Sequence, residues 1–208
     1  MFLKNCWYVA AWDHEVTLEP LARTLLCEPV VLFRGEDGKA VALEDRCCHR
    51  ALPLSMGKVV GDRLQCGYHG LEFDGTGACV HVPEQTHIPP GAAVRSYPVV
   101  ERWKWVWIWM GDPALADEAL IPDWWWFDHS EWEVVKGKYL RLDCNYELIT
   151  DNLLDLSHLA YVHLNTLGTG DIAEFPISTE REKDMIRMTR WIIDRPAPPM
   201  FQKLGNFS

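Results

Sequence analysis

Long apolar segments and an excess of positive charge are both missing from this 208-residue sequence. No apolar run approaches the roughly eighteen residues that would cross a bilayer, and residues 1–6 contain no apolar signal-peptide core. Twenty Lys and Arg residues face thirty Asp and Glu residues, which gives a formal net charge of −10. Nucleic-acid binding is disfavoured, because phosphate recognition needs clustered cations. We therefore expect a cytoplasmic protein with neither a membrane segment nor a nucleic-acid partner.

A disulfide framework is not indicated either, because the seven cysteines are odd in number. The sequence also lacks internal repeats and low-complexity tracts. A hydrophobic content of 48% can fill a core, and 208 residues can form one large or two small domains. The composition is that of an intracellular enzyme.

Two short segments, Cys47-x-His49 and Cys66-x-x-His69, each combine one thiol with one imidazole, and sixteen residues separate His49 from Cys66. A Rieske [2Fe–2S] cluster takes two Cys sulfurs on one iron and two His nitrogens on the other. The alternative is a Cys2His2 structural zinc site, but zinc modules usually place a Cys pair and a His pair in separate segments. The four residues therefore predict a Rieske cluster, which is a one-electron relay. The other cysteines are expected to be buried or incidental thiols: Cys6, Cys27, Cys48, Cys79 and Cys144.

The first half of the chain is predicted to be β-structure, since short apolar runs alternate with turn residues. From Trp103 to Trp109 a tryptophan occupies every second position, which places four indoles on one face of a strand. We interpret them as a buried aromatic wall rather than an electron-transfer chain. A small barrel or sandwich would present the two Cys/His segments at one end. The expected strands cover residues 23–27, 29–33, 39–44, 71–73, 78–82 and 103–109.

A domain boundary is predicted near residue 115, which gives domains of residues 1–115 and 116–208. The aromatic run Trp124–Phe127 then suits packing between the two domains better than a substrate pocket. A strand is expected over Glu133–Asp143, followed by a helix with Asn145 as its N-cap. The inward-facing residues of that helix are expected to be Leu148, Leu153 and Leu154.

A second group of polar residues, Asp155, His158 and His163, is expected on this helix. Asp155 and His158 are three positions apart, so they would share a helix face and could form a hydrogen bond. His158 and His163 are five apart, about 140° around an ideal helix, and can meet on one metal only if the helix loosens or ends between them. Two imidazoles and one carboxylate on Fe(II) leave positions open for dioxygen. The alternative is two ordinary helix histidines.

The two Cys/His segments, the run 71–75 and the run 151–163 together resemble the oxygenase component of a Rieske non-haem iron oxygenase, in the branch with vanillate and dicamba O-demethylases. The resemblance covers nearly the whole chain and implies an α+β fold. An N-terminal all-β Rieske domain would precede the first part of a helix-grip catalytic domain that holds one Fe(II). Cys48 stands where proline is frequent in the family, but it is not a ligand position. Further agreements lie at residues 5–10, 49–55 and 111–113.

This resemblance implies that His158 and His163 bind the mononuclear iron, with Asn152 nearby. Asp155 would be the electron bridge from His158 to a Rieske histidine of a neighbouring subunit, for which we expect His69, in a homotrimer. The third iron ligand is expected beyond residue 208, so the chain would stop inside the catalytic domain. The remaining acidic residues after His163 do not stand in the family's context: Asp171, Glu174, Glu180, Glu182, Asp184 and Asp194.

The resemblance further implies a terminal oxygenase that uses O2 to O-demethylate or hydroxylate an aromatic compound such as a methoxylated benzoate. An NAD(P)H-dependent reductase would supply electrons directly or through a ferredoxin. Ring hydroxylation and N-demethylation stay open within this class. The alternative from another class is a Rieske electron-transfer protein, or a catalytically incomplete fragment that lacks the third iron ligand.

Overall fold

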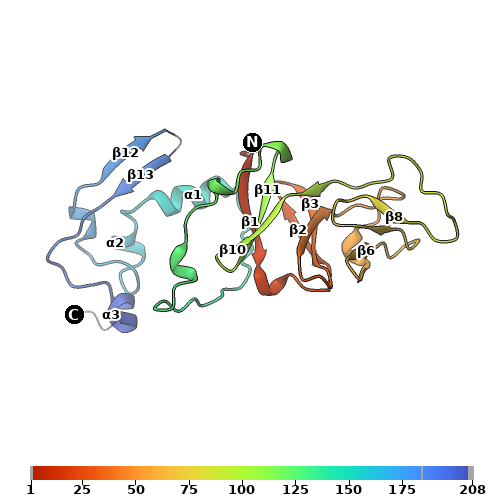
Figure 1. Cartoon of the computed structure of the whole chain (residues 1–208). Helices are drawn as coiled ribbons and strands as arrows, with labels where there is room; N and C mark the ends of the chain where they lie inside the picture. Colours follow the sequence, from red (N-terminus) through yellow and green to blue (C-terminus); the bar gives the residue numbers. More distant parts are fainter. Residues whose placement is uncertain (1, 184, 206–208) are drawn as a thin grey trace. The chain divides into compact units, whose positions relative to one another are not determined.

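The computed structural model describes residues 2–183 and 185–205, which form two compact units that meet in sequence between Tyr139 and Leu140 (Figure 1). The segment 116–139 belongs to the N-terminal unit, while the predicted domain boundary near residue 115 stays a prediction. In the described part of the chain, every helix is too short or too polar to cross a membrane.

The N-terminal unit contains three antiparallel sheets. The first has the strand order β1 (Cys6–Trp12), β11 (Trp105–Met110) and β10 (Val99–Arg102). The second has the order β2 (Leu21–Leu25), β3 (Glu28–Arg34), β4 (Ala40–Glu44) and β9 (Ser96–Tyr97). The third has the order β5 (Lys58–Val60), β6 (Arg63–Gln65), β7 (Glu72–Phe73) and β8 (Cys79–His81). Short 3-10 helices accompany them: η1 (Asp13–Glu15), η2 (Leu54–Met56), η3 (Pro113–Leu115), η4 (Glu118–Leu120) and η5 (Trp125–Phe127).

The predicted strands of this half are confirmed with ends shifted by one or two residues, and the shift at the tryptophan repeat comes from a turn. Trp103 and Lys104 form a turn with φ angles of 59° and 63°, so β11 begins only at Trp105. Trp107 and Trp109 are buried, as an aromatic wall requires. The alternate residues of β11 lie in the apolar core shared with β1 and β3, so both faces of this strand are covered: Val106, Ile108 and Met110.

The aromatic run after residue 123 packs against this same strand. The ring centroid of Trp105 lies 5.4 Å from that of Trp124 and 4.6 Å from that of Phe127. The aromatic run therefore packs against a strand that lies on the other side of the predicted boundary near residue 115. Both the run and the strand belong to the N-terminal unit.

The C-terminal unit contains α1 (Tyr146–Leu154), α2 (Leu159–Val162), η6 (Ile172–Glu174), the hairpin β12 (Ser178–Glu182) and β13 (Met185–Thr189), and α3 (Pro199–Gly205). The predicted start of α1 is confirmed, because the side chain of Asn145 accepts a hydrogen bond from the backbone N–H of Glu147 at 3.1 Å. The predicted inward face is wrong for the described structure. Its three leucines are 60%, 72% and 44% exposed: Leu148, Leu153 and Leu154.

The strand predicted over Glu133–Asp143 is also wrong, since this segment has no regular secondary structure and pairs with no strand of the described residues. Side chains hold it instead. Lys136 forms an ion pair with Asp13, and the guanidinium of Arg23 lies 4.7 Å from the ring centroid of Tyr139. An apolar pattern alone does not make a strand, because a strand needs a neighbour to complete its hydrogen bonds.

Candidate metal-binding sites

The first Cys/His loop follows β4, and its backbone closes a turn around Cys47. The N–H of Cys47 donates to the carbonyl of Leu52 at 2.9 Å, and the N–H of Ala51 donates back to the carbonyl of Cys47 at 2.9 Å. Ala51 closes the turn with a φ of 58°, a left-handed conformation that an alanine rarely adopts.

The second loop, between β6 and β7, repeats this turn around Cys66. The N–H of Cys66 donates to the carbonyl of Leu71 at 2.8 Å, and the N–H of Gly70 donates to the carbonyl of Cys66 at 3.0 Å. Gly70 has a φ of 73°, at the position that Ala51 occupies in the first loop. The two loops are thus two copies of one backbone turn, although the histidine follows its cysteine by two residues in one loop and by three in the other.

The side chains of the two loops sort by type. Cys47 and Cys66 are each 3% exposed and belong to the same buried cluster, where their thiols are close enough to interact. His49 and His69 are exposed, with ring centroids 4.7 Å apart and ring planes at 62°. An inner thiol pair and an outer imidazole pair fit a diiron cluster with sulfur ligands on one iron and nitrogen ligands on the other.

The environment of the thiols also suits a metal group. Burial raises the pKa of the Cys47 thiol to about 11, and the adjacent Cys66 thiol adds to the increase. Two neighbouring thiols in this environment become thiolates only when a cation replaces their protons. The donor set therefore fits an iron–sulfur cluster.

Buried charges next to the loops fix their backbone. Asp45 accepts hydrogen bonds from the backbone N–H and the hydroxyl of Ser55, at 2.7 and 2.6 Å. Glu72 accepts hydrogen bonds from Arg63 at 3.1 Å and from Gln65 at 3.0 Å. Sequence reasoning missed both carboxylates. The available signal was an acidic residue within two positions of a ligand loop, which alone is too common to be informative.

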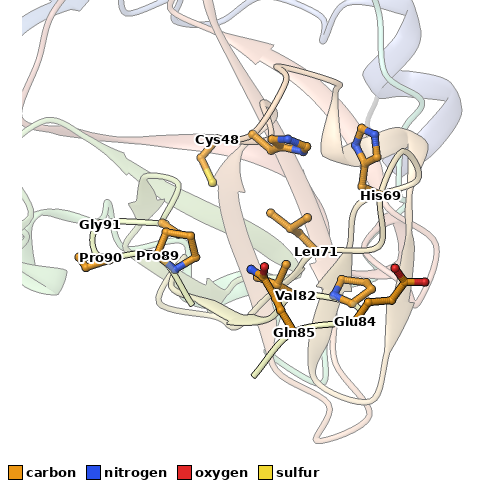
Figure 2. A pocket seen from close by; sticks show the side chains of 12 residues that line it. Cys48, His69, Leu71, Val82, Glu84, Gln85, Pro89, Pro90 and Gly91 are labelled. Atoms are coloured by element: carbon orange, nitrogen blue, oxygen red, sulfur yellow. The ribbon is translucent and has the colours of Figure 1, made fainter. Parts of the chain in front are cut away.

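A pocket of about 750 Å³ lies beside the two imidazoles. Figure 2 shows Cys48 and His69 at two sides of this pocket, with Leu71 between them and the segment 82–91 forming the opposite wall. The pocket gives direct access from the surface to the exposed histidines. Cys48, the cysteine that stands where proline is expected from the resemblance, also lines the pocket and is exposed.

In the C-terminal unit the helix ends before the second group of polar residues. α1 stops at Leu154 with Asp155 as its C-cap, and α2 is a single turn between His158 and His163. The expectation that Asp155 and His158 share one helix face is therefore wrong. The break meets the stated condition for the two histidines to approach each other, since their ring centroids are 5.2 Å apart.

The contact between Asp155 and His158 also differs from the predicted one. Nδ1 of His158 lies within hydrogen-bond distance of the backbone carbonyl of Asp155, but 3.8 Å from its carboxylate Oδ2. A carbonyl only accepts, so Nδ1 carries the proton in this contact and Nε2 is the nitrogen left for a metal. The Asp155 carboxylate accepts the N–H of Ser157 at 2.8 Å, and Asn152 is exposed on α1.

The acidic residues after His163 do not join the two histidines. Asp171 accepts a hydrogen bond from Thr169 at 2.6 Å and pairs with Arg195, and these contacts lower the pKa of its carboxyl, the Thr169 bond most. Over residues 2–183 and 185–205, no three side chains of His, Cys, Asp or Glu converge on a single ion position. Asp184 lies outside the described residues. The others are exposed: Glu174, Glu180, Glu182 and Asp194.

Comparison with known proteins agrees with both halves of this description. The profile of the Rieske [2Fe-2S] domain matches residues 6–98, and that of the vanillate O-demethylase oxygenase C-terminal domain matches residues 142–208. The toluene-4-sulfonate monooxygenase system iron-sulfur subunit of Comamonas testosteroni is 52% identical, over 100% of this chain and 60% of the relative. The dicamba O-demethylase oxygenase component of Stenotrophomonas maltophilia is 52% identical, over 78% of this chain and 48% of the relative.

A crystal structure of dicamba monooxygenase bound to 3,6-dichlorosalicylic acid matches with a TM-score of 0.92 and 42% identity. The match covers 100% of this chain and 61% of that one. The chain thus spans about half to 60% of the length of these relatives. The predicted fold class is confirmed, and the chain belongs to the Rieske oxygenases, in the branch of the vanillate and dicamba O-demethylase oxygenase components.

Proposed function

We propose that this chain belongs to a terminal oxygenase component that uses O2 and reductase-supplied electrons to O-demethylate or hydroxylate an aromatic compound. The carrying observation is the presence of two ligand sets in one chain. One is the buried thiol pair with its exposed imidazole pair, and the other is the pair His158 and His163 at the two ends of α2.

Each ligand set has a defined task in this proposal. Cys47, Cys66, His49 and His69 hold the Rieske cluster, and His158 and His163 hold Fe(II) together with a carboxylate expected beyond residue 208. When bound, these groups supply one-electron transfer and the activation of O2. The chain itself keeps the thiols out of water and leaves His49 and His69 at the surface, where a reductase or ferredoxin can deliver electrons.

Asp155 is the proposed electron bridge to a neighbouring subunit. Its side chain is 54% exposed, its Oδ1 accepts the Ser157 N–H, and its Oδ2 lies 3.8 Å from Nδ1 of His158. Within residues 2–183 and 185–205 Oδ2 accepts no hydrogen bond, so it can accept one from an exposed imidazole such as His69 of a second copy of the chain. Head-to-tail contact of this kind closes into a ring, and we propose a cytoplasmic homotrimer.

The substrate class follows from the relatives, which are named for aromatic compounds: toluene-4-sulfonate and dicamba. On a methoxylated substrate, insertion of one oxygen atom into a methyl C–H bond would give a hemiacetal. This product breaks down to the free hydroxyl compound and formaldehyde. The second oxygen atom leaves as water, formed with two electrons from the reductase and two protons.

The test is the substitution Asp155→Ala in the full-length oxygenase. Reduction of the Rieske cluster by the reductase should persist, while product formation should collapse. Retained turnover would refute the bridge. Iron analysis of the unsubstituted protein separates the oxygenase from a stand-alone electron carrier: three irons per subunit support the oxygenase, and two support the carrier.

A further inference from the structure

Arg190, just after β13, reaches across the C-terminal unit to the break between α1 and α2. Its Nη1 donates to the backbone carbonyl of Leu156 at 3.0 Å, and its Nη2 donates to the hydroxyl of Ser157 at 3.0 Å. The two acceptors are adjacent in the chain and lie 34 and 33 positions before Arg190. One rigid guanidinium therefore holds two successive residues of the break.

These two residues connect Asp155 to His158, the proposed bridge and the proposed iron ligand. The His158 ring is placed by its Nδ1 contact with the Asp155 carbonyl, and the Asp155 carboxylate is placed by the N–H of Ser157. Each contact depends on the path of the chain through residues 156 and 157. Fixing that path fixes the direction of the His158 ring and of the Asp155 carboxylate together.

The contact is retained at a cost to stability. Nε of Arg190 is buried and makes no hydrogen bond within the described residues. A buried N–H without an acceptor destabilises a folded chain, and such groups are uncommon in native structures. A side chain that only covered apolar surface would not need this arrangement. The two-point grip on the break accounts for it.

We propose that Arg190 is a positioning residue of the mononuclear iron site, which it supports by holding the linker between Asp155 and His158. This rests on the proposed function, because it takes His158 as an iron ligand. Within the described residues Arg190 forms no hydrogen bond with either imidazole, so its effect runs through the linker that it holds. A short, flexible linker without this grip would leave the two ligand directions loosely defined.

The test measures Fe(II) binding rather than turnover. The mononuclear iron of the full-length oxygenase is removed by mild chelation, Fe(II) is titrated back, and site occupancy is followed by the electron paramagnetic resonance of the nitric oxide adduct. Arg190→Lys keeps the charge but loses the two-point geometry. We expect it to weaken Fe(II) binding about 10-fold or more, as is common when an outer partner of a metal ligand is lost, and to broaden the signal.

Arg190→Gln separates geometry from charge. A cation near the iron opposes Fe(II) binding, so an effect of charge alone would strengthen binding in Arg190→Gln and leave Arg190→Lys unchanged. Positioning predicts weaker binding in both. Arg187→Lys is the matched control, because Arg187 is an exposed residue of β13 in the same hairpin. Wild-type affinity and an unchanged signal in Arg190→Lys would overturn the proposal.

Ser157→Ala decides the question if the Arg190 variants do not fold. It removes one of the two acceptors from the partly buried contact and should weaken Fe(II) binding about 2- to 10-fold, the equivalent of one hydrogen bond. Unchanged binding in that variant would refute the role of Arg190. Failure of the proposed function looks different, because the unsubstituted protein would then bind two irons per subunit and give no nitric oxide signal.

Discussion

The imidazoles of His49 and His69 lie with their ring centroids 4.7 Å apart, although twenty positions separate them in the sequence. They come from two loops whose backbone turns are the same, while their cysteines meet below them. Because both rings are exposed, neither contributes to the apolar core, and in the proposed cluster each would supply one nitrogen ligand.

His69→Ala should therefore abolish the visible absorption and the paramagnetic signal of the reduced cluster while the N-terminal unit stays folded. The reason is that the second iron loses one of its two nitrogen ligands. Visible spectroscopy and circular dichroism check this. His87→Ala, at an exposed histidine in the segment that forms the far wall of the pocket, is the control and should keep the full spectrum.

The two equivalent turn positions predict opposite effects on stability. Ala51→Gly should stabilise the protein by roughly 0.5–1 kcal/mol, because glycine adopts a φ of 58° without the strain of a Cβ. Gly70→Ala should destabilise it by at least about 1 kcal/mol, since the added Cβ would also lie 3.0 Å from Cγ of Pro83.

Urea unfolding midpoints of the two variants measure these effects. Gly61→Ala is a suitable reference, because Gly61 also has a positive φ of 62° but open space around its Cβ position. Gly70→Ala should be the more damaging of the two alanine substitutions. Equal losses would mean that the contact with Pro83 has no energetic weight.

Gly168 lies close to the backbone of α2 and forms a hydrogen bond to the residue that ends it. Its N–H donates to the carbonyl of His163 at 3.0 Å, and a Cβ here would lie 1.9 Å from the carbonyl oxygen of Leu159. Gly168→Ala must therefore displace the turn between His158 and His163. We expect loss of the mononuclear iron with the Rieske spectrum intact, because the four proposed cluster ligands lie in the other unit.

Iron analysis combined with visible spectroscopy tests this prediction. Gly170→Ala serves as its control, because the Cβ added there would meet only Cδ2 of Leu164 at an ordinary 3.8 Å. A Gly168→Ala protein that keeps three irons per subunit would show that α2 can move without loss of the site.

Glu28 predicts a pH dependence of stability for the N-terminal unit. The hydrogen bond from Lys4 is the main cause that lowers the pKa of its carboxyl below 4.5, and Tyr97 and Arg95 contribute, at 3.1 and 3.0 Å. A lowered folded-state pKa gives stability that is present above pH 4.5 and is lost as the pH falls through the folded-state value.

Glu28→Gln should therefore cost about 1 kcal/mol at pH 7, a modest value because the pair is partly solvated. The difference from the unsubstituted protein should shrink to zero in acid. Thermal unfolding at a series of pH values measures it, with the exposed Glu36→Gln as the control. A constant difference down to pH 3 would contradict the ionic origin.

The sequence by itself determined the parts of this protein that depend on neighbouring residues. The spacing of Cys47, His49, Cys66 and His69 predicted the two ligand loops, and short apolar runs predicted most strands of the first half. Asn145 predicted the start of α1 because an N-cap acts on the backbone within two or three residues.

Only the tertiary structure decided the features that depend on distant partners. The segment 133–143 is held through Lys136 and Tyr139 by contacts with Asp13 and Arg23, more than a hundred positions away. The break between Asp155 and His158 is held by Arg190. A local pattern cannot show which distant side chain will satisfy a backbone carbonyl, so hydrophobic period and capping rules could not locate that break.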